Sequence, residues 1–400
     1  MNNDATIFIP TYNRPDLLTR TIAFLQRGSM RLPIIVGDGS APEAAAKNEE
    51  ACRQLGPNIE YFHVPSPSEY GASSRSYLQR FVQAFDRVKT PFVVCCADDD
   101  ILLPETVVKA ADFLSKNPDY VACEGIYLIF QYDGDRLRID GKCYDSPSVD
   151  GGEIGSRLMQ FYTRYEAPFY AVVRTSIQKS IFARAQDINT LMLLETFHSA
   201  AIVAAGKLKR LDNIYNLRNL GVAPHARPVE GWNQWMARDF DDFFEHYRAH
   251  RARVMDFVSS LGGPKIDPQT LRRALDMSFI VYLGREFHSG YWLDEYLTTV
   301  IADRDERSKL RQQLNARHLT TTSPPISLGE VLKTSVKSVI KKGLGKRGKR
   351  FATQVVHPAV KNLTDIVPLA QDPSIRISRG LVSMFSDADW AFVSRRMRPE

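Results

Sequence analysis

Three consecutive carboxylates, Asp98, Asp99 and Asp100, are the residues whose spacing points most directly to chemistry. They follow the uncharged stretch 91–96, which has the pattern of a buried strand, and precede Pro104, which opens a predicted helix. In parallel α/β sheets, ligands bind outside the carboxyl ends of the strands, where these side chains stand. Carboxylate oxygens suit Mg²⁺ or Mn²⁺, which proteins often share with substrate phosphates. The triplet alone fits a solvated acidic turn, with one Asp capping the helix, equally well.

Polar segments also follow two earlier predicted strands. Strand 6–10 is closed by the segment 11–14, which reads Thr-Tyr-Asn-Arg. Strand 33–36 is closed by the segment 37–40, which reads Gly-Asp-Gly-Ser, and its glycines let a ligand approach the backbone closely. The segment 71–75, from Gly to Arg, opens a further helix.

Strands and helices alternate along the first part of the chain. Predicted strands are 6–10, 33–36, 59–64, 91–96, 120–123, 126–130, 169–173 and 208–215, and predicted helices include those that begin near 15, 71 and 104 and the one from 189 to 205. This alternation predicts an α/β fold with a mostly parallel sheet and helices on both faces. The segment 134–155 is polar and rich in turn residues, so we expect a long loop there.

Beyond about residue 224 the strand pattern disappears. Helices are predicted at 232–261, 268–288 and 293–318, and a Thr/Ser/Pro stretch at 320–325 resembles a linker. We therefore expect an α/β domain at 1–224, a helical accessory region at 225–320, and a basic amphipathic region at 321–400. The helical region would complete a site of the first domain or form a homodimer contact.

Composition is typical of a soluble globular protein, with 44% hydrophobic and 24% charged residues. No apolar run approaches the roughly 18–20 residues that a membrane span needs. The N-terminus has no pattern of a secretory signal, and the five cysteines have no metal-binding spacing, so we expect reduced, mostly buried thiols and a cytoplasmic protein.

Basic residues concentrate between 331 and 351, where eight Lys or Arg occur without an acidic residue, although the net charge of the whole chain is only +6. Leu332, Val336, Ile340 and Leu344 repeat every four residues, with lysines beside them, which predicts a basic amphipathic helix. A solvated face, an anionic membrane surface and a nucleic acid all fit this pattern. We favour peripheral attachment to the inner face of the plasma membrane and expect no nucleic-acid partner.

The segments 9–14, 36–40, 71–75 and 97–100 occur together in one order. In this respect the chain resembles the GT-A nucleotide-sugar glycosyltransferases of family 2, over about its first 220 residues. The resemblance implies a nucleoside-diphosphate sugar donor, with a UDP-sugar favoured, and a glycan or lipid-linked acceptor in surface polysaccharide or glycolipid assembly. It also implies Mn²⁺ or Mg²⁺ on a D-x-D element formed by Asp98 and Asp100, with Asp99 close to the transferred sugar.

The resemblance further assigns donor contacts and a catalytic base. Donor-binding positions are Pro10, Thr11, Tyr12, Arg14, Asp38, Arg75, Asp98 and Arg218. Asp38 would accept from a uracil-type base, and Arg75 and Arg218 would contact the phosphates or the sugar. Glu195, in the predicted helix 189–205, is the candidate general base of an inverting displacement, and Glu166 is its rival. His225 is a candidate third metal ligand, although a lone His near a domain boundary is more often a surface residue.

Three positions depart from the family pattern. Gly37 and Ala97 stand where the family commonly has Asp, and Ser76 stands where Asn often follows the Arg. These departures keep a non-catalytic binding or scaffold protein as an alternative. A nucleotidyltransferase is a second alternative, disfavoured because no glycine-rich phosphate loop follows the first strand. A Rossmann dehydrogenase is disfavoured because no G-x-G-x-x-G follows a predicted strand, and no G-x-S-x-G indicates a nucleophile.

Overall fold

The computed structural model describes residues 4–26, 31–66, 74–133, 136–144, 146–219, 232, 235, 239–262, 266–288 and 305. These residues group into two compact units. The first contains the described residues up to 219 together with 246–262 and 266–276, and the second contains 232, 235, 239–245, 277–288 and 305. The first unit carries every candidate site residue that the structure describes.

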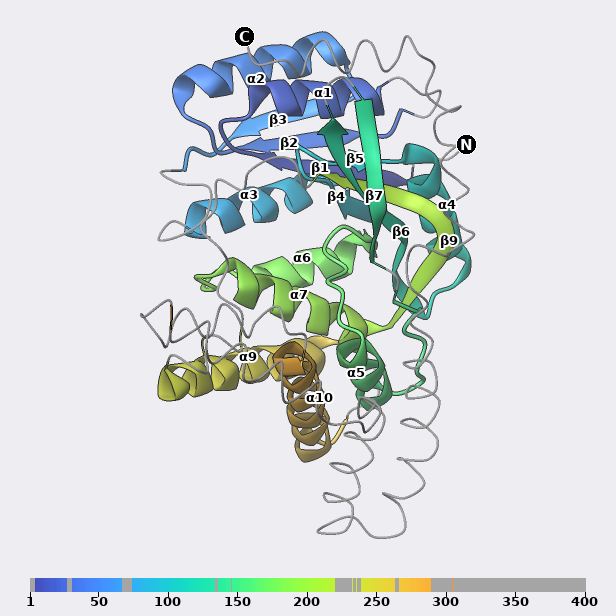
Figure 1. The fold of residues 1–400 in the computed structure, drawn as a ribbon, viewed down its shortest axis with the longest axis vertical. Helices are drawn as coiled ribbons and strands as arrows, with labels where there is room; N and C mark the ends of the chain where they lie inside the picture. The colour runs from blue at the N-terminus through green and yellow to red at the C-terminus, as the bar shows by residue number, and fades with distance from the viewer. Residues whose placement is uncertain are drawn as a thin grey trace. The chain divides into compact units, whose positions relative to one another are not determined.

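In the described part of the chain, nine strands form one sheet in the order β3-β2-β1-β4-β8-β6-β9-β5, with β7 beside β6 (Figure 1). The strands are β1 (Ala5–Thr11), β2 (Ile34–Asp38), β3 (Ile59–His63), β4 (Phe92–Cys95), β5 (Ile101–Leu102), β6 (Tyr120–Asp133), β7 (Arg136–Tyr144), β8 (Val172–Arg174) and β9 (Lys207–Asn219). Strands β1 to β4 pair in parallel, as does β6 with β9. The pairs of β8 with β4 and β6, of β7 with β6 and of β5 with β9 are antiparallel. The predicted α/β fold is confirmed, and its sheet is parallel in the N-terminal half and mixed beyond it.

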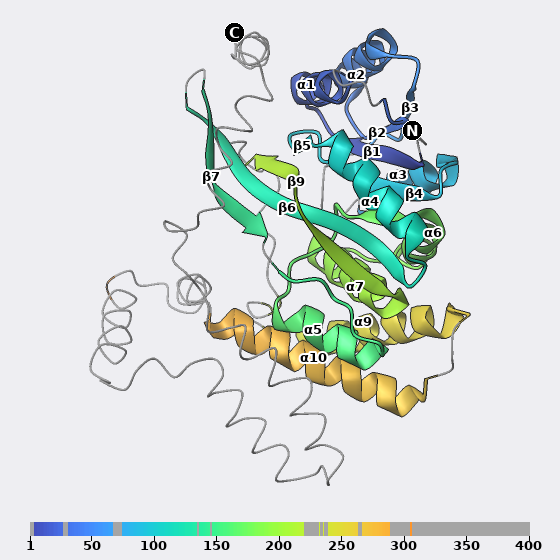
Figure 2. The ribbon, with the colours of Figure 1, turned by 90° about the vertical axis from the view of Figure 1, so that its right-hand side faces the viewer.

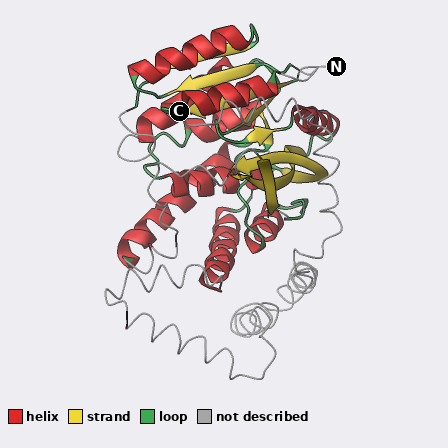
Figure 3. Ribbon diagram, turned by 45° about the horizontal axis from the view of Figure 1, so that its top comes forward, coloured by secondary structure: helices red, strands yellow, loops and turns green. Residues whose placement is uncertain are grey.

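Helices cover both faces of this sheet (Figures 1 and 3). The helices of the described residues are α1 (Pro15–Leu25), α2 (Pro42–Leu55), α3 (Ser74–Arg87), α4 (Pro104–Lys116), α5 (Ile154–Thr163), α6 (Thr175–Ala183), α7 (Leu191–Ala205), α9 (Phe240–Ser260) and α10 (Pro268–His288). Prolines occupy the first turns of α1, α2 and α4, where the missing N–H has no helical partner to lose.

Successive side chains of β1 point to opposite faces of the sheet, so this strand contributes to the core on both sides. Ile7 and Ile9 join one core cluster with residues of α1, α2 and α4, whereas Phe8 points the other way and packs edge-on against Phe81 and Phe85 of α3. Each of these fully buried side chains contributes about 2 kcal/mol to the free energy of unfolding. The core therefore holds the carboxyl ends of β1, β2 and β4 in fixed positions.

Several sequence predictions needed correction. The segment 134–155 is not a long loop, because β7 lies within it and pairs with β6; Figure 2 shows β7 and β9 along the two sides of the long strand β6. Helices α5 and α6 were not predicted. The predicted helix 268–288 is confirmed as α10, and the helix predicted at 232–261 is described as α9 from Phe240 to Ser260. The predicted helices at 293–318 and in 331–351 lie outside the described residues, so the three-part division of the chain stays a prediction.

The five cysteines are free thiols, and all except Cys143 are buried, as predicted. None of the described helices is long and apolar enough to cross a membrane.

Candidate active site

The acidic turn after β4 lies against the end of β1. The parallel pairing of these strands, with Phe8 opposite Cys95, brings the residues that follow them together. Thr11 Oγ1 donates to Asp98 Oδ2 at 2.7 Å, and Arg14 Nη1 donates to Asp98 Oδ1 at 3.2 Å. The two segments that the sequence singled out separately therefore form one polar site.

Side chains of α1 hold the backbone of this turn. Arg20 Nη2 donates to the carbonyl oxygen of Asp99 at 2.6 Å, and Thr21 Oγ1 donates to that of Asp98 at 2.7 Å. Both α1 side chains are buried. Because Arg20 and Thr21 bind the backbone carbonyls of the turn, its backbone is held in place and its carboxylates keep a fixed arrangement.

Asp100 is brought to the end of β9 by the short strand β5. The register pairs Ile101 with Leu217, which places Asp100 beside the two residues that end β9. The Asn219 N–H donates to Asp100 Oδ1 at 2.9 Å, and Arg218 Nε lies 3.9 Å from Asp100 Oδ2. Burial raises the pKa of Asp100 to about 7, a rise that Arg218 opposes and Asp99 reinforces.

The donor set fits a metal ion at one oxygen in particular. Among the described residues, no three His, Cys, Asp or Glu side chains converge as a complete metal site. Asp100 Oδ2, however, is buried and makes no hydrogen bond within the described part of the chain. Both oxygens of Asp98 already accept hydrogen bonds from Thr11 and Arg14. Asp100 is thus the better-fitting ligand, and the assignment of Asp98 and Asp100 to a metal stays a prediction.

Arg218 links the acidic turn to a group of tyrosines. Its Nη1 donates to the hydroxyl oxygen of Tyr144 at 2.9 Å. Its guanidinium lies 5.7 Å from the ring centroid of Tyr144 and 5.6 Å from that of Tyr170, within the range of cation–π attraction. These contacts orient a cation that is still 30% exposed, so it can meet an anionic ligand.

Glu195, the candidate base, lies close enough to Arg218 and Tyr144 to interact with both electrostatically. The Tyr165 hydroxyl donates to its Oε1 at 3.2 Å. Burial raises the pKa of Glu195 above the ordinary 4.5, although Tyr165 and Arg218 act in the opposite direction. A carboxylate with a raised pKa is a stronger base, which suits removal of a proton from an acceptor hydroxyl.

Glu166, the rival base, has a different environment. Its Oε2 accepts from the Ser146 N–H at 2.8 Å and forms a close ion pair with Arg210. Arg210 also pairs with the fully buried Glu124 at 2.8 Å. We call Glu124, Arg210 and Glu166 the Arg210 cluster. Because Glu166 is bound in this cluster, the geometry favours Glu195 as the base.

Asp38 is enclosed within its own loop. It has no exposed surface, and its carboxylate accepts from the Ser40 N–H at 2.7 Å, from Asn48 at 2.8 Å and from Tyr61 at 2.9 Å. A Cβ at Gly39 would lie 1.2 Å from Nη1 of Arg80, so any larger residue there would displace the Arg80 guanidinium. Contact between Asp38 and a base stays a prediction.

The loops after β1 and β2 are joined by Asn13. Its backbone has a positive φ of 54°, a conformation that Asn tolerates better than most residues. Its N–H donates to Ser40 Oγ at 2.7 Å, and its Oδ1 accepts from the Ala41 N–H at 2.9 Å. We call this pair of bonds the Asn13 clasp.

The remaining predicted site residues divide into two groups. Pro10 pairs with Gly37 within the sheet, and Tyr12 follows β1 with a partly exposed side chain. The side chain of Arg75 and all of His225 lie outside the described residues.

Sequence reasoning missed six residues of the site: Arg20, Thr21, Tyr144, Tyr165, Tyr170 and Asn219. Arg20 and Thr21 lie among the apolar residues of α1, so polar side chains beside a buried stripe could have indicated them. Tyr144 ends β7, whose alternating Leu137 and Ile139 indicate a strand. Tyr165 occurs in an irregular segment without any comparable pattern, and Tyr170 lies in the predicted strand 169–173 but in a turn just before β8.

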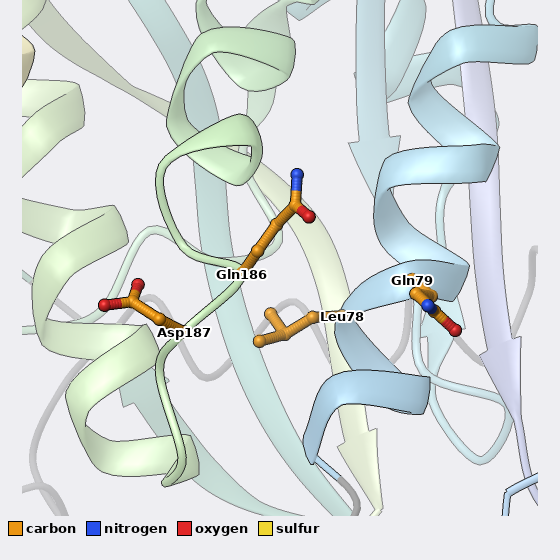
Figure 4. Close-up of a pocket in the computed structure, with 4 residues that line it drawn as sticks. All are labelled: Leu78, Gln79, Gln186 and Asp187. Carbon is orange, nitrogen blue, oxygen red and sulfur yellow. The ribbon is translucent and has the colours of Figure 1, made fainter.

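A hollow elsewhere in the first unit is lined by Leu78, Gln79, Gln186 and Asp187 (Figure 4). Its one carboxylate, that of Asp187, is bound by Arg253. The hollow shares no residue with the acidic turn, and it offers none of the turn's chemistry.

Comparison with known proteins identifies the class. Residues 6–183 match the family described as Glycosyl transferase family 2, a range that runs from β1 to the end of α6. The part of the chain from β1 to α6 is therefore a glycosyltransferase domain of family 2, and the predicted GT-A fold is confirmed for it. Glu195 and Arg218 lie outside the matched range, so their roles rest on geometry.

No curated protein matches the sequence. Solved structures similar to the chain include S. aureus TarS 1-349, at 13% identity and a TM-score of 0.47, covering 74% of this chain and 81% of that one. The same protein in complex with UDP-GlcNAc matches at 14% identity and a TM-score of 0.48, covering 76% of this chain and 77% of that one. Both likenesses are distant.

The raised pKa of Glu195 predicts a stability effect. Because the folded-state pKa lies above 4.5, ionised Glu195 destabilises the fold at neutral pH, and this penalty disappears below pH 4.5. We expect Glu195→Gln to increase the free energy of unfolding at pH 7.5, on the order of 1 kcal/mol, with a smaller gain at pH 4.5. Urea denaturation at both pH values measures this, with exposed Glu43→Gln as the matched control. A less stable Glu195→Gln at pH 7.5 would contradict the expectation.

Proposed function

We propose that the protein is a metal-dependent, inverting glycosyltransferase that moves a sugar from a nucleoside-diphosphate donor, with a UDP-sugar favoured, to a glycan or lipid-linked acceptor. The observation that carries this proposal is the position of Arg218. Asp100 lies 3.9 Å from it, and Glu195 interacts with it electrostatically. One cation thus interacts with both a candidate metal ligand and a candidate base.

The acidic turn would bind the donor diphosphate. Asp100, with its buried Oδ2, would hold the metal ion, which neutralises charge on a leaving diphosphate. Arg218 would contact the same phosphates, and Asp99 would lie near the sugar. Thr11 and Arg14, which bind Asp98, would keep this edge of the site rigid.

The preference for uracil as the nucleobase of the donor rests on the family position of Asp38. Its Oδ2 accepts two internal hydrogen bonds and its Oδ1 one, so Oδ1 has capacity left for the imide N–H of uracil. Since the side chain has no exposed surface, this contact needs a small movement of the loop that contains Gly39 and Ser40.

The transfer would be a single displacement. The acceptor oxygen forms a bond to the anomeric carbon while its proton passes to Glu195. The bond between the anomeric carbon and the diphosphate oxygen breaks, and its electron pair leaves with the nucleoside diphosphate. Configuration at the anomeric carbon inverts, and the raised pKa of the partly buried Glu195 favours proton uptake.

Donor binding is tested by thermal shift with a panel of nucleoside diphosphates, with and without Mn²⁺. We expect UDP with Mn²⁺ to stabilise the wild type by about 2.7 kcal/mol at a hundredfold excess over Kd. Asp100→Asn should lose this metal-dependent part, whereas Asp112→Asn, the same change at an exposed position of α4, should retain it. A wild type that no nucleotide stabilises would favour a non-catalytic binding protein.

The base is tested with Glu195→Gln. We expect transfer to fall 10²–10⁴-fold, as for loss of a general base, while UDP still stabilises the variant. Glu166→Gln serves as the comparison, because it alters the rival carboxylate. If Glu166→Gln loses transfer and Glu195→Gln keeps it, the two roles must be exchanged.

The basic segment 331–351 would hold the enzyme at the inner face of the plasma membrane, near a lipid-linked acceptor used in surface polysaccharide assembly. This part of the proposal rests on the sequence pattern, since the segment lies outside the described residues. The helical region would contribute to the acceptor site or to a homodimer.

Membrane attachment is tested by sedimentation of the full chain with vesicles. We expect binding to vesicles that contain phosphatidylserine and much weaker binding to pure phosphatidylcholine, because each basic residue contributes about 1 kcal/mol near an anionic surface. Replacing Lys333, Lys337 and Lys341 with Gln should weaken the binding strongly. Equal binding to both vesicle types would rule out the electrostatic attachment.

A further inference from the structure

Tyr165 lies between α5 and β8, and its hydroxyl reaches Glu195 of α7. An ionised carboxylate can only accept hydrogen bonds, so the tyrosine is the donor in this pair. The ring of Tyr165 stacks on that of Tyr162, with centroids 6.0 Å apart and an interplanar angle of 14°, and meets Phe161 edge-on at 5.1 Å. Packing against α5 therefore fixes the direction in which the hydroxyl points.

Both sequence neighbours of Tyr165 are anchored. The carbonyl oxygen of Arg164 accepts from Ser146 Oγ at 2.8 Å, and Glu166 Oε2 accepts from the Ser146 N–H at 2.8 Å. Arg210 contacts Glu166 twice, at its carboxylate and at its carbonyl oxygen. The backbone on either side of Tyr165 is thus held by polar contacts rather than left free to move.

The Arg210 cluster fixes these anchors to the sheet. Arg210 belongs to β9 and Glu124 to β6, and the two strands pair at these residues. Glu124 also accepts from the Tyr127 hydroxyl at 2.8 Å. Removing one partner of such a buried ion pair leaves an uncompensated charge, so the cluster resists rearrangement.

Among the described residues, three titratable groups interact with Glu195: Tyr165 after α5, Tyr144 of β7 and Arg218 of β9. Arg218 and Tyr144 are hydrogen-bonded to each other. Tyr165 engages Oε1 of Glu195, which leaves Oε2 for an acceptor hydroxyl.

We propose that Tyr165, anchored by the Arg210 cluster, is a positioning residue that holds the carboxylate of Glu195 in the orientation needed to take a proton from the acceptor. This inference rests on the proposed role of Glu195 as the base. Its hydrogen bond also favours the ionised form of the carboxylate, the only form that can accept the proton.

Tyr165→Phe tests the proposal, because it removes the hydroxyl and keeps the ring that packs on Tyr162 and Phe161. In the full-length enzyme at saturating donor and acceptor, kcat plotted against pH should fall at low pH, because Glu195 becomes protonated there; we call this fall the acidic limb. We expect this acidic limb to move up by about one pH unit in Tyr165→Phe, with donor KM unchanged. An acidic limb in the wild-type position would overturn the proposal, whatever the plateau value of kcat.

Tyr247→Phe is the matched control. It removes a phenol hydroxyl that also donates to a carboxylate, that of Asp276, outside the proposed site. We expect its acidic limb to coincide with that of the wild type. A limb that moves equally in both variants would count against a specific role of Tyr165.

A direct titration separates this inference from the proposed function. With glutamate labelled by ¹³C at the side-chain carboxyl, the resonance missing in Glu195→Gln identifies Glu195, and its pKa can be followed by NMR. We expect a higher pKa of Glu195 in Tyr165→Phe, independent of any transfer activity. An unchanged pKa would overturn the role of Tyr165 and leave Glu195 as the base, whereas an active Glu195→Gln would overturn the assignment of Glu195 and, with it, the positioning role of Tyr165.

Discussion

The pairing of β9 is the constraint on which the site depends. This strand lies alongside β6 over most of its length and meets the two-residue strand β5 at its end. Pairing with β6 places Arg210 beside Glu124, and pairing with β5 places Arg218 and Asn219 beside Asp100. A shift of one residue would turn each of these side chains to the opposite face of the sheet. Ion pairs at one end of β9 and a backbone hydrogen bond to Asp100 at the other both act against such a shift.

Burial of charge distinguishes this site from an acidic surface turn. Burial raises the pKa of Asp100, Glu124 and Glu195. Each group has a nearby arginine that partly offsets the unfavourable burial: Arg218 for Asp100 and Glu195, and Arg210 for Glu124. Such an arrangement lowers the stability of the fold at neutral pH, and the apolar layers around β1 and β4 supply the compensating free energy. Functional sites commonly show this kind of local conflict with stability.

The ends of the early strands could be predicted because short apolar runs and polar turns leave a clear pattern. Thr11, Arg14, Asp98 and Asp100 were found in this way, and the structure brings them to one edge of the sheet. Glu195 and Arg218 were assigned by position along the chain, but their proximity depends on strand pairing between distant segments. No local periodicity encodes the register of β5 with β9. Tyr165 could not be predicted, since its role comes from packing against α5 and from an ion-pair cluster contributed by other strands.

The Asn13 clasp has a mechanical consequence. Two hydrogen bonds in opposite directions connect the loop after β1 to the loop after β2, so the two loops behave as a single rim. A ligand that displaces Ser40 would pull on Asn13, and through the same short segment on Thr11 and Arg14, which bind the acidic turn. Contact with the nucleoside end of a donor and the geometry around its phosphates would then be coupled through fewer than five residues of backbone. The rim would thus transmit the identity of the base to the place where the bond breaks.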